Sequence, residues 1–456
     1  MPLFQRNNKE EPKDNYRSDY IVSNSYIDEL VEHYKSRLLT EVNLEQLTSL
    51  HDADKRLKIE RFINQFMTEE KVVIPRHDKE TLLTRLIDES VGFGPIESLL
   101  KDDEITEILV NGPKEIYVEK YGKLEQVDVA FKDEAHVRHI VDRVVAPLGR
   151  RIDESSPMVD ARLPDGSRVN AVISPISLGG TIISIRKFRK TPFIMDDLQK
   201  YGTFTSDMSK FLQALVKGKM NVLISGGTGS GKTTLLNALA KVIPLNERVI
   251  TIEDSAELRL GRKNAVGMEA RPPNVEGEGE ISIRQLVKNS LRMRPDRIIV
   301  GEVRGAEAFD MLQAMNTGHE GSLTTVHSNT PTDAINRVEG MVVMAGMNLP
   351  THIIREYIVG ALDYIVQVQR LSDGTRKIMN IAEVEVGKDN KIEVRDIFRF
   401  KRTAVDEQGM IHGYYTATGI RPKCIELMET LGITFRTDFF EPEGEITDEL
   451  NRVRTL

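Results

Sequence analysis

The sequence has a single cysteine, Cys424, and no tryptophan. One cysteine cannot form an intrachain disulfide, and it excludes a four-cysteine zinc site or an iron–sulfur cluster. We therefore expect no structural zinc and a reducing compartment. No apolar run approaches the roughly 18 residues that a membrane-spanning helix needs, and the charged N-terminus lacks the apolar stretch of a secretory signal. Any membrane role is expected to be peripheral.

Basic residues are outnumbered, 62 against 70 acidic residues, so the net charge is −8, and aromatic residues make up only 6%. A dedicated duplex-DNA binder has the opposite charge balance, and proteins that track a single strand use basic grooves with stacking rings. Composition thus gives no support for direct nucleic-acid binding. The share of apolar residues, 40%, is that of an ordinary globular protein.

The length, 456 residues, predicts roughly two to four domains. Apolar residues at spacings of three and four predict helices before residue 90, and a strand, a glycine-rich turn, a helix and another strand follow from about residue 206. Apolar and polar residues alternate over 377–386 and 391–400, on either side of 388–390, and this pattern predicts a hairpin near the end of the chain. The predicted segments are a disordered polar tail (1–20), a helical module (21–90), an N-terminal α/β domain (91–188), a linker (189–205), a catalytic α/β domain (206–402) and a C-terminal appendage (403–456).

The strongest motif is a phosphate-binding loop of the form G-x-x-x-x-G-K-[ST], preceded by an apolar strand and followed by a helical segment. Its glycines let backbone N–H groups curl around phosphate oxygens. Lys232 is expected to reach the β- and γ-phosphates of ATP, and Thr233, more than Thr234, to offer a hydroxyl to Mg²⁺. The predicted nucleotide-binding residues are Gly226, Gly227, Thr228, Gly229, Ser230, Gly231, Lys232, Thr233 and Thr234.

Acidic residues end two apolar segments downstream of this loop. The first ends in Glu253 and Asp254, with Glu257 shortly after, and the second ends in Gly301-Glu302. Ligands of open α/β sheets bind at the carboxyl ends of strands, so these acids are candidates to position water or to hold Mg²⁺. Taken alone, acids in the position of the first group are more often solvated or cap the next segment.

Two further groups of residues have open interpretations. His319 and His327 lie in one hydroxyl-rich stretch, without a third ligand for zinc. Either is a candidate sensor of the γ-phosphate, although such pairs are more often structural. The segment before Gly301 also contains Arg292, Arg294 and Arg297, which form either a solvated basic face or a surface for phosphate or a neighbouring subunit.

In order along the chain, GGTGSGKTT, IEDSAEL, LRMRPDRIIVGEVRG and TGHEGSLTTVH resemble the Walker A, Asp-box, Walker B and His-box motifs of the secretion ATPases of type II and type IV secretion and of type IV pili. The stretches GRRIDESSPMVDARLPDGSRV and RPPNVEGEGEISIRQLV are similar to the Tad/Flp pilus branch, which is CpaF-like. The resemblance covers about 90–400. Members of this family commonly have a Gly-Glu pair where this chain has Gly301-Glu302.

The resemblance implies a RecA-like ATPase domain packed beneath an N-terminal α/β domain, and a ring of six subunits. It also implies that the protein is cytoplasmic and acts on platform proteins of the inner membrane. It implies that Arg168 and Arg186 contact phosphates, Glu257 positions or activates water, Glu302 acts on Mg²⁺ and its waters, and His327 couples the γ-phosphate to domain movement. Two other functions remain open at this stage, a nucleic-acid translocase or helicase on the same core, and a scaffold that binds ATP without turnover.

Overall fold

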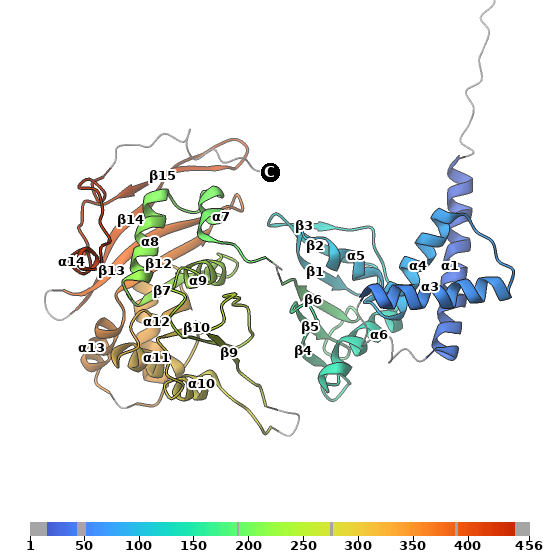
Figure 1. Cartoon of the computed structure of the whole chain (residues 1–456), viewed down its shortest axis with the longest axis horizontal. Helices are drawn as coiled ribbons and strands as arrows, with labels where there is room; N and C mark the ends of the chain where they lie inside the picture. Colours follow the sequence, from blue (N-terminus) through green and yellow to red (C-terminus); the bar gives the residue numbers. More distant parts are fainter. Residues whose placement is uncertain are drawn as a thin grey trace, which may run out of the picture. The chain divides into compact units, whose positions relative to one another are not determined.

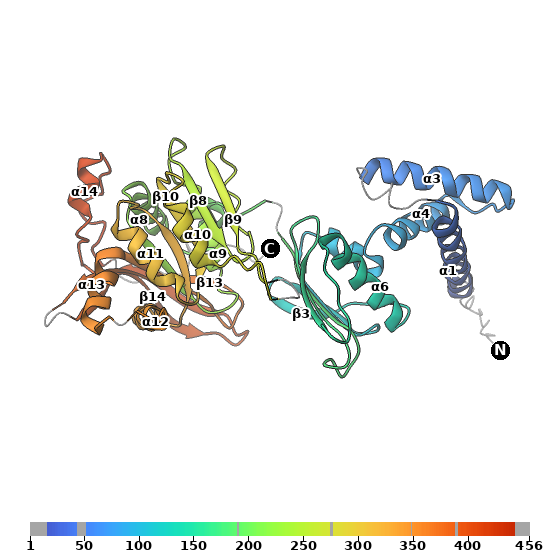
Figure 2. The same ribbon diagram turned by 90° about the horizontal axis from the view of Figure 1, so that it is seen from below.

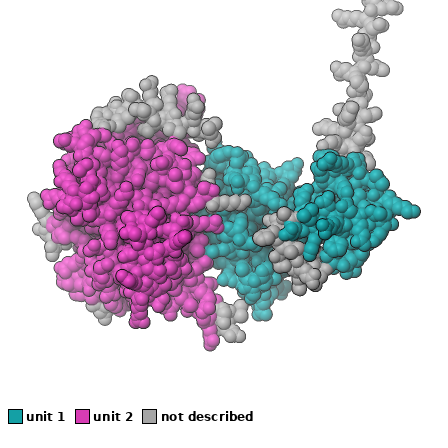
Figure 3. All heavy atoms as spheres, viewed as in Figure 1, with its two compact units in different colours: residues 1–189 teal, residues 190–456 magenta. Residues whose placement is uncertain are grey.

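The computed structural model describes residues 16–42, 52–188, 191–273, 277–347, 349–387 and 391–442. The chain divides into two compact units, Met1–Arg189 and Lys190–Leu456 (Figure 3). Residues 1–15 of the predicted tail lie outside the described residues, and helix α1 begins at Tyr16, inside that prediction. Within the described ranges, no helix is long and apolar enough to cross a bilayer.

The first unit opens with a helical module of α1 (Tyr16–Glu41), α3 (Asp52–Glu69) and α4 (Arg76–Ser90), shown in blue in Figure 1. The first set of apolar positions at this spacing is buried, and it comprises Ile27, Leu30, Val31, Tyr34 and Leu38, whereas Leu57 of α3, from a later set, is exposed. The residues of the first set pack against buried residues of α3 and α4, so these three helices share one small core. Apolar residues at spacings of three and four thus do form the packed face.

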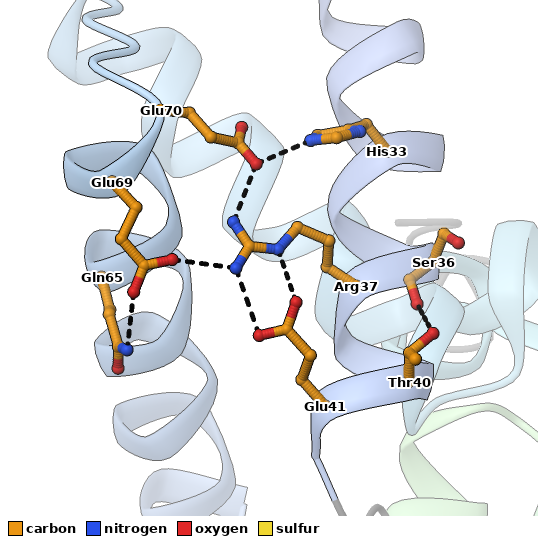
Figure 4. Close-up of polar contacts among 8 residues, drawn as sticks. All are labelled: His33, Ser36, Arg37, Thr40, Glu41, Gln65, Glu69 and Glu70. Carbon is orange, nitrogen blue, oxygen red and sulfur yellow. Dashed lines mark hydrogen bonds and ion pairs between the residues drawn. The ribbon is translucent and has the colours of Figure 1, made fainter.

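An ion-pair cluster joins α1 to the end of α3 (Figure 4). Arg37 donates hydrogen bonds to Glu41 at 2.8 Å, to Glu69 at 2.9 Å and to Glu70 at 2.8 Å. His33 lies 2.9 Å from the same oxygen of Glu70. The hydrogen bond from Arg37 is the largest cause of a lowered pKa at Glu69. The cluster fixes how the two helices are aligned.

The rest of this unit is a six-stranded antiparallel sheet in the order β3-β2-β1-β6-β5-β4. Helix α6 (Glu134–Val145) packs its apolar stripe on the sheet, and Asp133 caps its first turn by accepting from the backbone N–H of His136. The other elements are η1 (Gly94–Ile96), α5 (Glu97–Lys101), β1 (Ile105–Asn111), β2 (Ile116–Lys120), β3 (Lys123–Gln126), η2 (Ala146–Leu148), β4 (Met158–Arg162), β5 (Arg168–Val172) and β6 (Ile182–Arg186).

The second unit is built on a nine-stranded mixed sheet in the order β15-β14-β13-β12-β7-β11-β10-β8-β9. The run from β12 to β9 is parallel, and β13, β14 and β15 are added antiparallel at the edge of β12. The strands are β7 (Val222–Gly226), β8 (Val249–Glu253), β9 (Ala265–Glu269), β10 (Arg297–Val303), β11 (Leu323–His327), β12 (Tyr364–Arg370), β13 (Arg376–Val386), β14 (Ile392–Val405) and β15 (Ile411–Ala417).

Helices cover both faces of this sheet (Figures 1 and 2). Alternate residues of β7 show this, because Val222 and Ile224 pack with α8 and α9 while Leu223 packs with α10 to α13. A parallel sheet buried on both faces requires strands that are apolar throughout. The helices are α7 (Met195–Lys200), α8 (Ser206–Lys217), α9 (Lys232–Ala240), α10 (Ile283–Ser290), α11 (Glu307–Asn316), α12 (Pro331–Met344), α13 (Thr351–Ala361) and α14 (Ile425–Thr430).

The described parts of the segments predicted as a linker and as an appendage, 191–205 and 403–442, are integrated into the second unit, and the rest of both segments lies outside the described residues. Helix α7 lies within 189–205, and its Met195 and Leu198 are buried in the core with α8 and α9. Strand β15 extends the sheet, and Phe439 and Phe440 pack against the ring of Phe398. Aromatic residues that are widely spaced in the sequence supply this packing, so the sequence pattern alone did not reveal it.

Candidate nucleotide-binding site

The predicted phosphate loop connects the carboxyl end of β7 to the amino end of α9. A Cβ atom on Gly226 would lie 2.4 Å from the carbonyl oxygen of Val368 and 2.5 Å from Oγ of Ser230, so only glycine fits there. Gly229 and Gly231 have φ angles of +69° and +94°. These left-handed values favour glycine, and they let the loop fold back over the first turn of the helix.

The side chain of Lys232 lies within this loop. Its Nζ atom donates to the carbonyl oxygens of Gly226 at 3.0 Å and Gly227 at 3.1 Å. Ser230 Oγ donates to the carbonyl oxygen of Gly227 at 2.8 Å. The ammonium group therefore lies in the loop that leads into the amino end of α9, where the helix dipole is positive. Two positive groups at one position favour the binding of an anion. Thr233 and Thr234 lie in the first turn of α9 and are half-buried.

Parallel pairing brings the other candidates to the same edge of the sheet. His327, the last residue of β11, pairs with Gly226 at the end of β7. Glu302 lies near the end of β10 and Glu253 ends β8, and these strands follow β11 in the sheet. His319 precedes β11 and so lies at the opposite end of that strand. Of the two histidines, the fold brings only His327 to the loop.

The environment of His327 favours its neutral form. Burial is the largest cause of a lowered pKa, and the positive charge of Lys232 lowers it further. A neutral imidazole has one donor and one acceptor nitrogen. It can therefore take part in a hydrogen-bond network beside a phosphate group without adding positive charge.

The two acidic segments are held in different ways. Arg304 donates to Glu302 at 2.7 Å and also lies 3.4 Å from Asp254, so it links the ends of β10 and β8. Glu253 is buried, with 4% exposure, and its carboxylate accepts the backbone N–H of Glu257 at 2.8 Å. Glu257 itself is half-buried in the turn that follows β8. The sequence pointed to the acids but gave no sign of their partner Arg304.

The interpretation of the three arginines before Gly301 as a basic face is wrong for Arg297. Its side chain is fully buried and pairs with Glu247, and its guanidinium also donates to the carbonyl oxygens of Val216 and Gly321. These contacts satisfy a charge that would otherwise be costly to bury. Arg297 starts β10, so it lies at the opposite end of the sheet from the phosphate loop.

Arg168 and Arg186 lie in the first unit, where they are directly paired across β5 and β6. Their neighbours Val169 and Ile185 are buried, so the two arginines lie on the face of the sheet away from the core. Like charges directly opposite each other on a sheet are unfavourable. Glu107 of β1 is paired directly with Arg186 on its other side, so an acidic residue lies beside this pair.

One residue beside the loop was missed by sequence reasoning. Arg376, the first residue of β13, donates from Nε to the carbonyl oxygen of Gly229 at 3.0 Å. A Cβ on Gly231 would lie 3.4 Å from Cδ of the same arginine. Arg376 thus holds the far side of the phosphate loop. No local motif marks it, because β13 joins the sheet long after the loop in the sequence.

The family described as type II/IV secretion system protein matches residues 89–421 of the chain. The chain belongs to this family. A Mycobacterium tuberculosis relative with a provisional conjugal-transfer name is 35% identical over 330 residues, 71% of this chain and 93% of the relative. The type IV secretion system protein VirB11 of Bartonella quintana is 32% identical over 325 residues, 63% of this chain and 90% of that protein.

Solved structures of secretion ATPases are also similar to the chain. The VirB11 ATPase of the Brucella suis type IV secretion system, in complex with sulphate, is 29% identical with a TM-score of 0.35, and the match covers 63% of this chain and 94% of that one. The pilus retraction motor PilT with bound ADP is 20% identical with a TM-score of 0.46, over 64% of this chain and 80% of that one.

In this secretion-family chain the central strand order is β12-β7-β11-β10-β8. The strand that carries the phosphate loop thus lies between β12 and β11, and the acidic strands follow β11. This is the order of a RecA-like ATPase domain. The predicted fold class, an α/β protein with a RecA-like domain, an N-terminal α/β domain and a small helical module, is confirmed.

Proposed function

We propose that the chain hydrolyses ATP and works as a homohexameric motor of a type IV pilus or a related type II/IV secretion machine. The observation that carries the proposal is the convergence of Lys232, Glu302, His327 and the turn bearing Glu257 on one edge of one parallel sheet. Phosphoryl transfer needs mainly positioning and charge neutralisation, and these groups supply both.

The donors beside the loop suit Mg²⁺. Thr233 offers a hydroxyl and Glu302 a carboxylate, and both are the hard oxygen ligands that this ion prefers. Over the described residues, no three His, Cys, Asp or Glu side chains gather as a metal-binding group. A magnesium ion that is held largely by phosphates and waters does not need such a group. When bound, it neutralises charge on the phosphate oxygens.

The acids and the histidine have separate roles in this proposal. Glu257 positions or activates the attacking water, and Glu302 acts on Mg²⁺ through water. His327, kept neutral beside Lys232 by its lowered pKa, senses the γ-phosphate and couples its loss to domain rotation. The remaining loop residues bind the phosphates of ATP through their backbone N–H groups.

The assembly and the cellular role rest on the family resemblance. Arg168 and Arg186 contact the phosphates from the N-terminal domain, six subunits form a ring, and rotation is passed to inner-membrane platform proteins. The motor works on the cytoplasmic side and is held at the membrane by these partners, without direct nucleic-acid binding. The stretches GRRIDESSPMVDARLPDGSRV and RPPNVEGEGEISIRQLV, one in each domain, favour a role in a Tad/Flp pilus like that of CpaF-like ATPases.

The test is the rate of ATP hydrolysis per subunit, measured against protein concentration with and without Mg²⁺ and alongside the size of the assembly. We expect no rate without Mg²⁺, and a rate per subunit that rises with concentration and then saturates, since subunit association completes the site. Absence of hydrolysis at saturation would contradict the ATPase proposal, and activity from monomers would contradict the ring. Stimulation by single-stranded or duplex DNA would favour a translocase.

A further inference from the structure

The carboxylate of Glu253 caps the turn that carries Glu257. Its Oε2 atom accepts the backbone N–H of Glu257 at 2.8 Å and that of Leu258 at 3.1 Å. Oε1 lies 3.3 Å from the same Leu258 nitrogen. Two successive amides are thus held by one buried acid.

The backbone of Glu253 is itself fixed on the neighbouring strand. It pairs with Glu269 in β9, and its carbonyl oxygen accepts the N–H of Ala270 at 2.9 Å. A carboxylate that extends from a strand end anchored in this way has little freedom to move. Its burial, at 4% exposure, adds a second constraint, because a buried polar group must keep its hydrogen bonds. The turn after β8 is therefore held from inside the sheet.

Gly301 provides the space that this side chain occupies. A Cβ atom at Gly301 would lie 2.9 Å from Cγ of Glu253 and 3.6 Å from its Oε2 atom. The preceding residue, Val300, pairs with Ile252, so β10 places Gly301 beside the end of β8. Any side chain at this position would displace Glu253.

We propose that Glu253 is a positioning residue for ATP hydrolysis, because it fixes the turn that presents Glu257, and that Gly301 lacks a side chain to make room for it. The inference rests on the proposed function, in which Glu257 acts on water. Glu253 acts here through the turn rather than on the substrate, because its Oε2 atom accepts both backbone amides of that turn. A small displacement of Glu257 costs rate while leaving the phosphate loop intact.

The experiment compares Glu253→Ala, Glu253→Gln, Gly301→Ala and the double variant Glu253→Ala/Gly301→Ala in the full chain. We expect kcat to fall on the order of 10²-fold in Glu253→Ala and in Gly301→Ala, with little change in ADP affinity. Glu253→Gln keeps an acceptor oxygen and should restore most of the rate. The double variant should be no slower than Glu253→Ala, because the added methyl group then has space.

Hydrogen exchange in the nucleotide-free chain gives a readout that does not need activity. The amides of Glu257 and Leu258 should exchange faster in Glu253→Ala and Gly301→Ala. Glu269→Ala, at the neighbouring strand end and exposed, is the matched control and should change neither readout. Wild-type exchange in Glu253→Ala, or additive losses in the double variant, would overturn the inference. A wild-type chain without hydrolysis would instead overturn the proposed function.

Discussion

Arg304 lies 2.7 Å from the carboxylate of Glu302, and this contact joins the two acidic strand ends of the site. The hydrogen bond to Glu302 is the largest cause of a raised pKa at Arg304, and Asp254 adds to it. The backbone N–H of Arg304 is also fixed, at 2.6 Å from Glu307 in the first turn of α11. One cation therefore balances two carboxylates at the edge of the sheet where the phosphates of ATP are proposed to bind.

Replacing Arg304 with alanine should increase the apparent affinity for Mg²⁺. Without the guanidinium, Glu302 and Asp254 lose the cation that pairs with both of them, so a divalent ion is favoured there. Because Arg304 is 62% exposed, the pair contributes at most about 1 kcal/mol, which corresponds to a shift of about fivefold. A magnesium titration of the hydrolysis rate measures this shift, and Arg304→Lys is the control that keeps the charge. A weaker apparent affinity for Mg²⁺ in Arg304→Ala would contradict the assignment of Glu302.

The substitution Lys232→Ala should abolish turnover and weaken ATP binding. The ammonium group lies within the phosphate loop, 3.0 Å from the carbonyl oxygen of Gly226, and alanine removes the charge that meets the β- and γ-phosphates. Lys241→Ala, just past the end of the same helix, is the matched control, because that lysine donates to the carbonyl oxygen of Pro192 instead. Hydrolysis and equilibrium binding of ATP are measured together. Normal turnover in Lys232→Ala would refute the site.

Replacing Glu257 with glutamine should reduce kcat by orders of magnitude and leave nucleotide binding largely intact. A residue that positions water acts mainly in the transition state, so its loss appears in kcat rather than in binding. Glu302→Gln is the companion variant, and we expect it to change the magnesium dependence as well as the rate. If only Glu302→Gln showed a loss of kcat with intact binding, the roles of the two acids would be reversed.

Much of the site could be predicted because its parts are short and continuous. The phosphate loop needs only a strand, a few glycines and a helix in succession, and each acidic segment is an apolar strand followed directly by its acid. Parallel strands end at the same edge of a sheet, so the convergence of these segments follows from their direction alone. The residue pattern by itself did not separate His327 from His319, because the choice depends on where β11 begins, and only the family resemblance favoured His327.

The contacts that hold the site could not be predicted. Arg304 pairs with Asp254, and Gly301 accommodates Glu253, across strands whose order in the sheet differs from their order in the chain. The same limit applies to Arg376, which reaches the phosphate loop from β13. Such pairs have no spacing rule in the sequence. They depend on the packing of strands from distant parts of the chain.

A last prediction concerns the junction between the helical module and the N-terminal α/β domain. Glu89, at the end of α4, lies 2.8 Å from Lys35 in α1 and 3.1 Å from His136 in α6. Burial raises the pKa of Glu89, but the neighbouring His136 and Lys35 prevail and lower it from 4.5 to about 2. Because its carboxylate is well covered, at 16% exposure, the pair interactions are only weakly screened.

The sign of the pH dependence follows from this lowered pKa. Since the pKa of Glu89 is lower in the folded chain than in the unfolded one, its stabilising contribution is complete above about pH 4.5 and is lost as the pH falls towards 2. Glu89→Gln should therefore destabilise the junction at about pH 6, and less at about pH 3. Comparing the amide exchange of α1, α4 and α6 in the two proteins at each pH measures this difference. Glu32→Gln, which removes an exposed pair with Lys132, is the control, and an equal effect of Glu89→Gln at both pH values would contradict the lowered pKa.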